Sequence, residues 1–168
     1  DCPERLPPVA ITLTHGHGQA AAWALPPGAA GGLPGIDLEL VRPRRLGTLR
    51  FYLHPEEREW VLELPGSDVD PPPKGADPTP RDQAAIVLWS LKEAAFKALQ
   101  PPRGTGLLDV AVELEDPFDA PQGRARITYR GTAVERASQL GATSVEAGWT
   151  QSDGLVLAWT VALGARLP

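Results

Sequence analysis

The chain has 168 residues, and this length predicts a single domain because soluble domains usually contain roughly 100 to 200 residues. It carries 16 lysines and arginines against 21 aspartates and glutamates, a formal net charge of −5, and it has no basic run suited to a nucleic-acid backbone. No apolar run approaches the roughly 20 residues that cross a bilayer. We therefore expect one domain over residues 1–168, with neither nucleic acid nor a membrane as a partner.

The cysteine content and the start of the chain give two further expectations. Cys2 is the only cysteine, which fits a reducing compartment, and no signal peptide is recognisable, so we expect a cytoplasmic protein. The chain begins at Asp1 and contains no methionine. This pattern indicates either a processed product or a piece of a longer polypeptide, and we favour the piece.

The first part of the chain predicts three strands. Residues 9–14 and 20–25 are apolar segments separated by a turn that contains Gly16 and Gly18, which is the pattern of a β-hairpin. A stretch rich in proline and glycine follows, and residues 35–41 then predict the third strand.

The middle of the chain predicts helices. Pro55 suits the first turn of a short helix over residues 55–63. Residues 65–80 carry six prolines and no apolar periodicity, so we expect a surface loop that is not well ordered. The longest helix is predicted over residues 81–99, where Thr79 is the candidate N-cap and an aspartate three residues later completes a capping box.

The long helix has a broad apolar side and a narrow polar stripe when its residues are placed at about 100° intervals. The stripe contains Asp82, Ser90, Glu93, Lys97 and Gln100. Alternating segments then predict strands at residues 108–114, 125–129, 144–150 and 155–163, the last of them a buried central strand. This order of elements predicts an α+β fold in which one long helix and shorter helices pack on a mostly antiparallel sheet.

Two acidic residues on the third strand form the first candidate site. Asp37 and Glu39 are two positions apart, so their side chains share one face of a strand. Neighbouring carboxylates repel unless a cation lies between them, and hard oxygen ligands suit Mg²⁺ bound to a phosphate. The alternative is the solvent-facing side of an edge strand.

The long helix carries the second candidate site, in which Glu93 and Lys97 are one turn apart. An ordinary ion pair on an exposed face is the simpler interpretation. However, the helix is so apolar that most of it must be buried, and a charged stripe on such a helix is a candidate for lining a cleft.

Residues 14–17, Thr-His-Gly-His, form the third candidate site at the end of a strand. They offer a hydroxyl, two imidazoles and accessible backbone N–H groups. The alternatives are a plain glycine turn or a zinc hydrolase built on His15, His17 and His54.

Taken in order, these clusters resemble the signatures of the 4′-phosphopantetheinyl transferase superfamily. Those signatures are Ser-His-Ser, Gly-(Ile/Val)-Asp-x-Glu and (Trp/Phe)-(Ser/Cys)-x-Lys-Glu-(Ala/Ser)-x-x-Lys, and this chain has Thr-His-Gly at 14–16, Gly-Ile-Asp-Leu-Glu at 35–39 and Trp-Ser-Leu-Lys-Glu-Ala-Ala-Phe-Lys at 89–97. The segment 51–60 is similar to the family's intervening segment. The resemblance is strongest to the Sfp type and covers most of residues 9–163.

The resemblance implies the fold of that family and transfer of the phosphopantetheine arm of coenzyme A to a serine of an acyl or peptidyl carrier protein. The metal ligands it implies for Mg²⁺ are Asp37, Glu39 and Glu93. Glu93 would also take the proton of the attacking serine, with Lys97 and Lys92 as further catalytic residues. The residues it implies for binding coenzyme A are Thr14, His15, Lys92, Lys97 and Arg103.

Two departures from the family pattern bear on the assembly. Sfp-type enzymes contain two similar halves, and this chain has the end of the first half followed by a complete second half. Either a second copy completes the site in a homo-oligomer, or the N-terminal half lies outside this piece. The usual Gly-Lys-Gly after the long helix is replaced by residues 101–106, in which Arg103 stands in for the lysine.

A catalytically degenerate transferase fold, acting as a scaffold in a larger synthase, is the alternative function.

Overall fold

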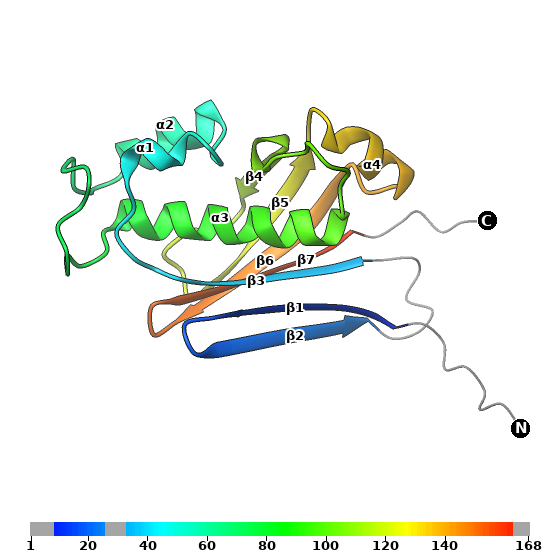
Figure 1. Cartoon of the computed structure of the whole chain (residues 1–168), viewed down its shortest axis with the longest axis horizontal. Coiled ribbons are helices and arrows are strands. Elements are labelled where there is room, and N and C mark those ends of the chain that lie inside the picture. Colours follow the sequence, from blue (N-terminus) through cyan, green and yellow to red (C-terminus); the bar gives the residue numbers. More distant parts are fainter. Residues whose placement is uncertain (1–8, 26–32, 163–168) are drawn as a thin grey trace, which may run out of the picture.

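The computed structural model describes residues 9–25 and 33–162, and it has the expected α+β plan (Figure 1). The strands are β1 (Ala10–Gly16), β2 (Gln19–Leu25), β3 (Leu33–Leu40), β4 (Val110–Leu114), β5 (Gln122–Tyr129), β6 (Ser144–Ser152) and β7 (Leu155–Ala162). The helices are α1 (Leu46–Leu49), α2 (Pro55–Glu63), α3 (Pro80–Leu99) and α4 (Ala133–Gln139), with a 3₁₀ turn at Leu107–Asp109. None of the described helices is long and apolar enough to span a bilayer.

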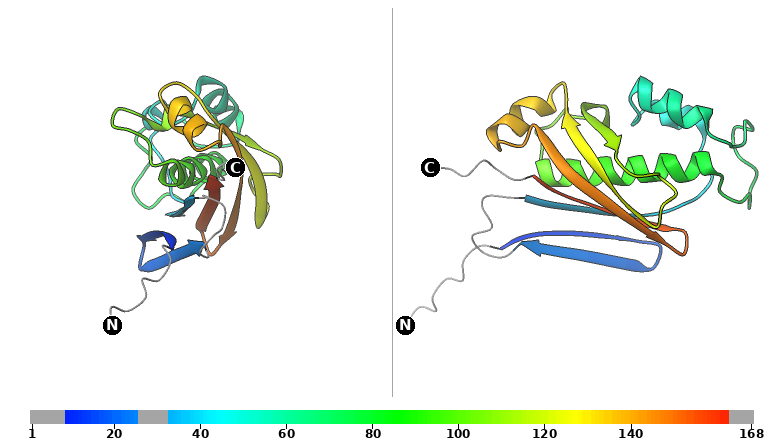
Figure 2. Two further views of the ribbon diagram at one scale, coloured as in Figure 1. Left: turned by 90° about the vertical axis from the view of Figure 1, so that its right-hand side faces the viewer. Right: turned by 180° about the vertical axis from the view of Figure 1, so that it is seen from behind.

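The hairpin and the third strand form where the sequence predicts them. His17 and Gly18 both have positive φ angles, 53° and 77°, as a two-residue turn with the twist of the flanking strands requires. The hairpin is a two-stranded sheet of its own and lies beside β3 (Figures 1 and 2). Its β1 strand turns Thr12 and Thr14 inward and leaves the alternate residues exposed.

The main sheet has five antiparallel strands in the order β3-β7-β6-β5-β4. β7 is therefore an interior strand, as expected, although β6 is the one in the middle. β3 is an edge strand of this sheet. Helix α3 lies along one face, where Val156, Ala158 and Ala162 of β7 are buried beneath it (Figure 1).

Gly35 sets the distance between α3 and β3. A Cβ placed on this residue would lie 1.9 Å from the carbonyl oxygen of Ala94, closer than any side chain permits. The helix backbone therefore rests directly on the strand at this point. This contact brings the polar residues of the two elements within reach of one another.

The capping box that begins α3 is confirmed, and the polar stripe is narrower than the sequence indicates. The Thr79 hydroxyl accepts a hydrogen bond from the Asp82 N–H, while the Asp82 carboxylate accepts from the Thr79 N–H at 2.9 Å. Asp82 also accepts from the Arg44 N–H, and both Asp82 and Ser90 are buried. Tertiary packing thus covers two of the residues that helical periodicity assigns to the polar side.

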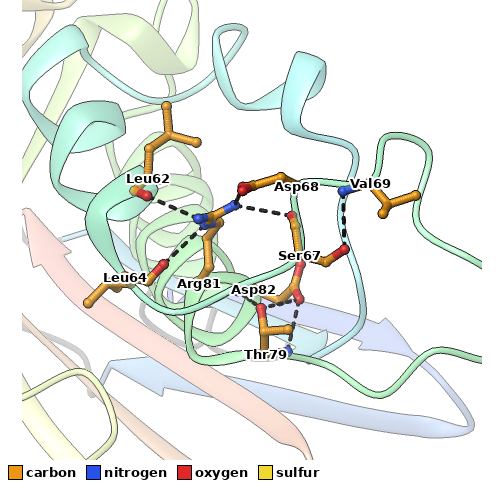
Figure 3. Close-up of polar contacts among 8 residues, drawn as sticks. All are labelled: Leu62, Leu64, Ser67, Asp68, Val69, Thr79, Arg81 and Asp82. Carbon is orange, nitrogen blue, oxygen red and sulfur yellow. Dashed lines mark hydrogen bonds and ion pairs between the residues drawn. The ribbon is translucent and has the colours of Figure 1, made fainter.

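The loop between α2 and α3 is held at its beginning by Arg81 (Figure 3). Arg81 is 8% exposed, and its guanidinium donates to the carbonyls of Leu62 and Leu64 and to the Asp68 carboxylate at 2.8 Å. It thereby caps the last turn of α2. The sequence predicts disorder over residues 65–80, and that stays a prediction, but in the structure the first residues of the loop follow a path fixed by these contacts.

Candidate active site

The candidate site lies where β3, α3 and β1 meet. The Lys97 ammonium is 2.8 Å from Asp37 Oδ1, donates to the Ile36 carbonyl at 3.1 Å and is 3.5 Å from the Thr14 hydroxyl. The Asp37 side chain is 7% exposed and that of Lys97 is 33% exposed. Three residues that the sequence places in separate motifs are thus brought together at the border of the core.

The second carboxylate oxygen of Asp37 has no partner. Oδ1 accepts from Lys97 and Thr14, but Oδ2 is buried and makes no hydrogen bond among the described residues. Buried polar atoms are nearly always satisfied, because an unmade hydrogen bond leaves the desolvation cost uncompensated. An anionic oxygen left in this condition is suited to a cation or a ligand donor.

Glu93 shares the electrostatic environment of the two acidic residues on β3. Burial raises the pKa of Glu93 above its ordinary value, the Asp37 carboxylate raises it further, the Lys97 ammonium opposes the rise, and Glu39 adds to it. The three carboxylates that the sequence assigns to one metal site therefore act on one another in the structure.

Two residues outside the Asp37–Lys97 pair contact the Glu39 carboxylate. Its Oε1 accepts from the Trp89 indole N–H at 3.2 Å, and its Oε2 is 3.6 Å from Arg44 Nη2. The Arg44 guanidinium also lies over the Trp89 ring, 5.8 Å from its centre. Sequence reasoning missed Arg44, although a run of arginines directly after an acidic strand was a signal that could have indicated it.

The donor set fits a hard divalent cation, but the side chains are not converged on one point. Carboxylate oxygens are the ligands that Mg²⁺ prefers, and Asp37 Oδ2 is free to accept. Within residues 9–25 and 33–162, however, no three acidic or histidine side chains are arranged to hold a metal ion. Lys97 occupies one oxygen of Asp37, and Glu39 is turned to Trp89 and Arg44. Binding a metal would require these carboxylates to rotate.

Two of the candidate residues, one within the third motif and one beyond it, are not brought to this cluster. Lys92 is fully buried and pairs with Glu57 on α2 at 2.7 Å. Arg103 is exposed on the loop after α3, and no hydrogen bond or ion pair joins it to the cluster in the described part of the chain. The family resemblance assigns Lys92 to the site, in a flanking role because it lies about 100° around the helix from Glu93.

The histidines lie apart from the carboxylates. His15 is on the exposed face of the hairpin, opposite to Thr14, because adjacent strand residues point to opposite faces. His17 is in the hairpin turn, and His54 is at the N-terminus of α2. They form no cluster of three potential ligands among the residues described, which removes the support for a zinc site.

The fold and the site define a protein of the α+β class with an acidic cluster between an edge strand and the long helix. A model of the 4′-phosphopantetheinyl transferase superfamily matches residues 34–159, so the chain belongs to that superfamily. The expected family membership is confirmed. The match starts at β3, and the hairpin that carries Thr14 and His15 precedes it.

A solved structure has the same fold as this chain. It is the crystal structure of holo-ACP-synthase from Plasmodium yoelii, which matches this chain with a TM-score of 0.53 and 17% sequence identity over 79% of this chain and 94% of that chain. At this identity the likeness confirms the fold. No curated protein sequence matches the chain.

Proposed function

We propose that this chain transfers the 4′-phosphopantetheine arm of coenzyme A to a serine of an acyl or peptidyl carrier protein, with Mg²⁺. The observation that carries the proposal is the Asp37–Lys97 ion pair at the crossing of β3 and α3, with Glu93 near enough for both to affect its pKa, in a member of the transferase superfamily. The serine oxygen attacks the phosphorus that bears the pantetheine arm. The bridging P–O bond breaks, and adenosine 3′,5′-bisphosphate leaves with the electron pair.

Asp37 and Glu93 are the residues proposed to hold the metal, with Glu39 as a third ligand after it turns from Trp89. Mg²⁺ supplies neutralisation of the diphosphate charge, which is the main demand of phosphoryl transfer. Glu93 also accepts the serine proton. In the metal-free protein, burial and then Asp37 raise the pKa of Glu93, while Lys97 opposes the rise.

Lys97 is proposed to stabilise the leaving phosphate. Its ammonium is already oriented by Asp37 and the Ile36 carbonyl, and a third of its side chain is exposed, so it can reach a bound anion. The Thr14 hydroxyl accepts a hydrogen bond from that ammonium at 3.5 Å and lies 3.5 Å from Asp37 Oδ1, on the same side as Asp37. His15 is an exposed residue of the same hairpin, and a coenzyme A contact from it would come from the outer face.

A scaffold that has lost catalysis is the second candidate function. It is favoured by the ion pairs that engage the carboxylates, since Lys97 and Arg44 take positions where a metal-binding enzyme holds its ion. Calorimetry with coenzyme A distinguishes the two. The enzyme binds coenzyme A more tightly with Mg²⁺ than with a chelator, whereas the scaffold shows no metal-dependent difference.

The direct test is mass spectrometry of carrier proteins incubated with the chain, coenzyme A and Mg²⁺. A panel of acyl and peptidyl carriers is expected to contain at least one that gains the phosphopantetheine mass on its serine. The matched control omits Mg²⁺ and adds a chelator. Absence of the adduct from every carrier, with coenzyme A bound, would reject the transferase and leave the scaffold.

A further inference from the structure

Lys92 and Glu57 form a buried ion pair that the proposed chemistry does not use. The Lys92 side chain has no exposed surface, and that of Glu57 is 10% exposed. The ammonium is 2.7 Å from Glu57 Oε2 and also donates to the carbonyls of Val110 and Leu107. An ammonium has three N–H groups, and all three are therefore occupied. Lys92 is left with no donor for a substrate.

The Glu57 carboxylate is equally occupied. It accepts from the His54 N–H at 2.7 Å, which caps α2, and from the Val112 N–H at 2.9 Å, in the middle of β4. The pair thus joins the N-terminus of α2, the beginning of β4 and the middle of α3. Fully satisfied polar networks of this kind fix one arrangement of the elements they connect.

Stability alone does not account for this pair. Removing two charges from water is costly, so apolar side chains of similar volume are often as stable as a buried ion pair. Burial lowers the pKa of Lys92 and Glu57 partly restores it, which reflects that cost. Hydrogen bonds are directional, so this pair constrains how far α3 is rotated and where it sits along its axis more narrowly than apolar side chains at these two positions would.

That rotation decides where the candidate catalytic residues point. Glu93 follows Lys92 directly, about 100° around the helix, and Lys97 is one turn beyond Glu93. With Lys92 tied to the α2 and β4 side of α3, Glu93 and Lys97 face β3. We infer that the Lys92–Glu57 pair is a positioning pair, which holds α3 in the rotation that presents Glu93 and Lys97 to Asp37. The inference rests on the proposed function and moves Lys92 from a catalytic to a positioning role.

The test compares wild type with Glu57→Gln and with the double variant Lys92→Met/Glu57→Leu, which replaces both charges by apolar side chains of similar volume. Glu59→Gln is the matched control, because Glu59 is an exposed residue of the same helix. Urea unfolding first measures the stabilities of wild type and the variants, and two further quantities are then measured. One is the transfer rate, and the other is the indole N–H signal of Trp89 in NMR spectra of the free protein, assigned with Trp89→Phe.

The Trp89 signal reports the seating of α3 without any substrate, because its indole N–H bonds Glu39 on β3. The double variant is expected to unfold at a urea concentration near that of wild type, to shift the Trp89 signal and to transfer about 10- to 100-fold more slowly, as misplacement by about 1 Å can cost. Glu57→Gln is expected to shift the signal in the same direction, while Glu59→Gln changes neither measurement.

An unshifted Trp89 signal in the folded double variant would overturn the inference, whatever the transfer rate. Full transfer would then make the pair purely structural, and lost transfer would mean that the pair supports catalysis by some route other than the rotation of α3. Failure of both variants to fold would make the pair a requirement for folding and reject the positioning role as well. If wild type itself transfers nothing, the proposed function fails, but the Trp89 signal still decides the inference.

Discussion

Gly35 of β3 lies against Ala94 of α3 so closely that a Cβ on the glycine would be 1.9 Å from the Ala94 carbonyl oxygen and 2.8 Å from the Ala98 nitrogen. Strand and helix therefore touch backbone to backbone. Two residues along the same strand, Asp37 is 2.8 Å from Lys97. The glycine of the Gly-Ile-Asp-Leu-Glu motif thus has a packing reason, since it permits the approach on which the site depends.

Gly35→Ala is expected to separate α3 from β3. The added methyl group meets backbone atoms, which cannot rotate away, so it should cost about 1–3 kcal/mol of stability or more. Transfer should fall on the order of 100-fold, because the catalytic groups shift relative to Asp37. Urea unfolding and the transfer assay measure the two effects. Gly106→Ala is the control, since a Cβ there meets nothing within 4 Å, and equal stability of the two variants would contradict the close contact.

Asp37→Asn is expected to remove Mg²⁺-dependent transfer while preserving the fold. Asparagine keeps the shape of the side chain, and Lys97 is exposed enough to be solvated without its partner. Loss of residues that merely support a metal ligand costs 10- to 100-fold, so loss of a ligand should cost more than about 100-fold. Circular dichroism and calorimetry with Mg²⁺ check fold and metal binding. Exposed Asp119, changed to Asn, is the matched control; near wild-type transfer by Asp37→Asn would refute the metal assignment.

Glu93 gives a pH prediction for the metal-free protein. Burial, and then Asp37, raise the pKa of Glu93 above its ordinary 4.5, so the folded state holds this proton at pH values where the unfolded state has lost it. Ionisation of Glu93 therefore lowers stability as the pH rises through the raised pKa. Glu93→Gln should be more stable than wild type at pH 7 in a chelator, and the difference should vanish below about pH 4.5.

Urea midpoints of wild type and Glu93→Gln across pH 4 to 8 measure this difference. A constant difference at every pH would show that the glutamine acts through packing and not through charge. Added Mg²⁺ should reverse the order at pH 7, because a bound cation stabilises the ionised carboxylate and has nothing to bind in the variant.

Local patterns in the sequence predicted most of the elements correctly. The hairpin forms, although its turn is at His17 and Gly18 and the predicted turn residue Gly16 ends β1. The capping box at Thr79 starts α3 where it was expected. Helix α4 was missed because it is short, with only Ala133 and Ala137 buried, so its periodicity is weak over seven residues.

The parts of the site that sequence could not predict depend on contacts between distant segments. Glu57 is 35 positions before Lys92, and only the packing of α2 against α3 makes them partners. Whether the His15 side chain points toward β3 or toward solvent depends on which face of the hairpin packs on β3. Strand alternation alone allows either face. By contrast, Asp37 and Glu93 could be identified as candidate site residues from the sequence, because each occupies a fixed position of a family motif. That identification does not depend on how the fold brings the two motifs together.

Trp89 binds Glu39 in the structure. Its indole N–H donates to the Glu39 carboxylate, and its ring packs edge-on against Tyr52 with 4.8 Å between the ring centroids. Trp89→Phe keeps the ring contact and removes only the donor. It should cost about 1 kcal/mol or less of stability and strengthen Mg²⁺ binding severalfold, because Glu39 no longer has to break its hydrogen bond to Trp89 before it turns to the ion. Calorimetry measures the affinity, and unchanged Mg²⁺ binding would remove Glu39 from the ligands.

The outer face of the hairpin bears on assembly. Ile11 and Leu13 of β1 are 62% and 64% exposed, and β2 adds alanines to the same face. An exposed apolar sheet face of this kind is typical of a contact surface. The sequence leaves two occupants open, a second copy of the chain or the first half of a longer protein.

We expect the isolated chain to be monomeric and to bind coenzyme A weakly. Among the described residues, Lys97 is the one cation paired with the Asp37 carboxylate, so little positive charge lies there to bind the phosphates of coenzyme A. Sedimentation at several concentrations, run beside the transfer assay, tests this expectation.

If activity per chain instead falls on dilution together with dissociation, a second copy completes the site. Ile11→Thr/Leu13→Thr then identifies the surface, because polar side chains at these positions should weaken an oligomer formed through the hairpin. They should leave one formed through another face unchanged. A monomer with full, dilution-independent activity would contradict both arrangements and show that the contacts around Asp37, Glu93 and Lys97 suffice on their own.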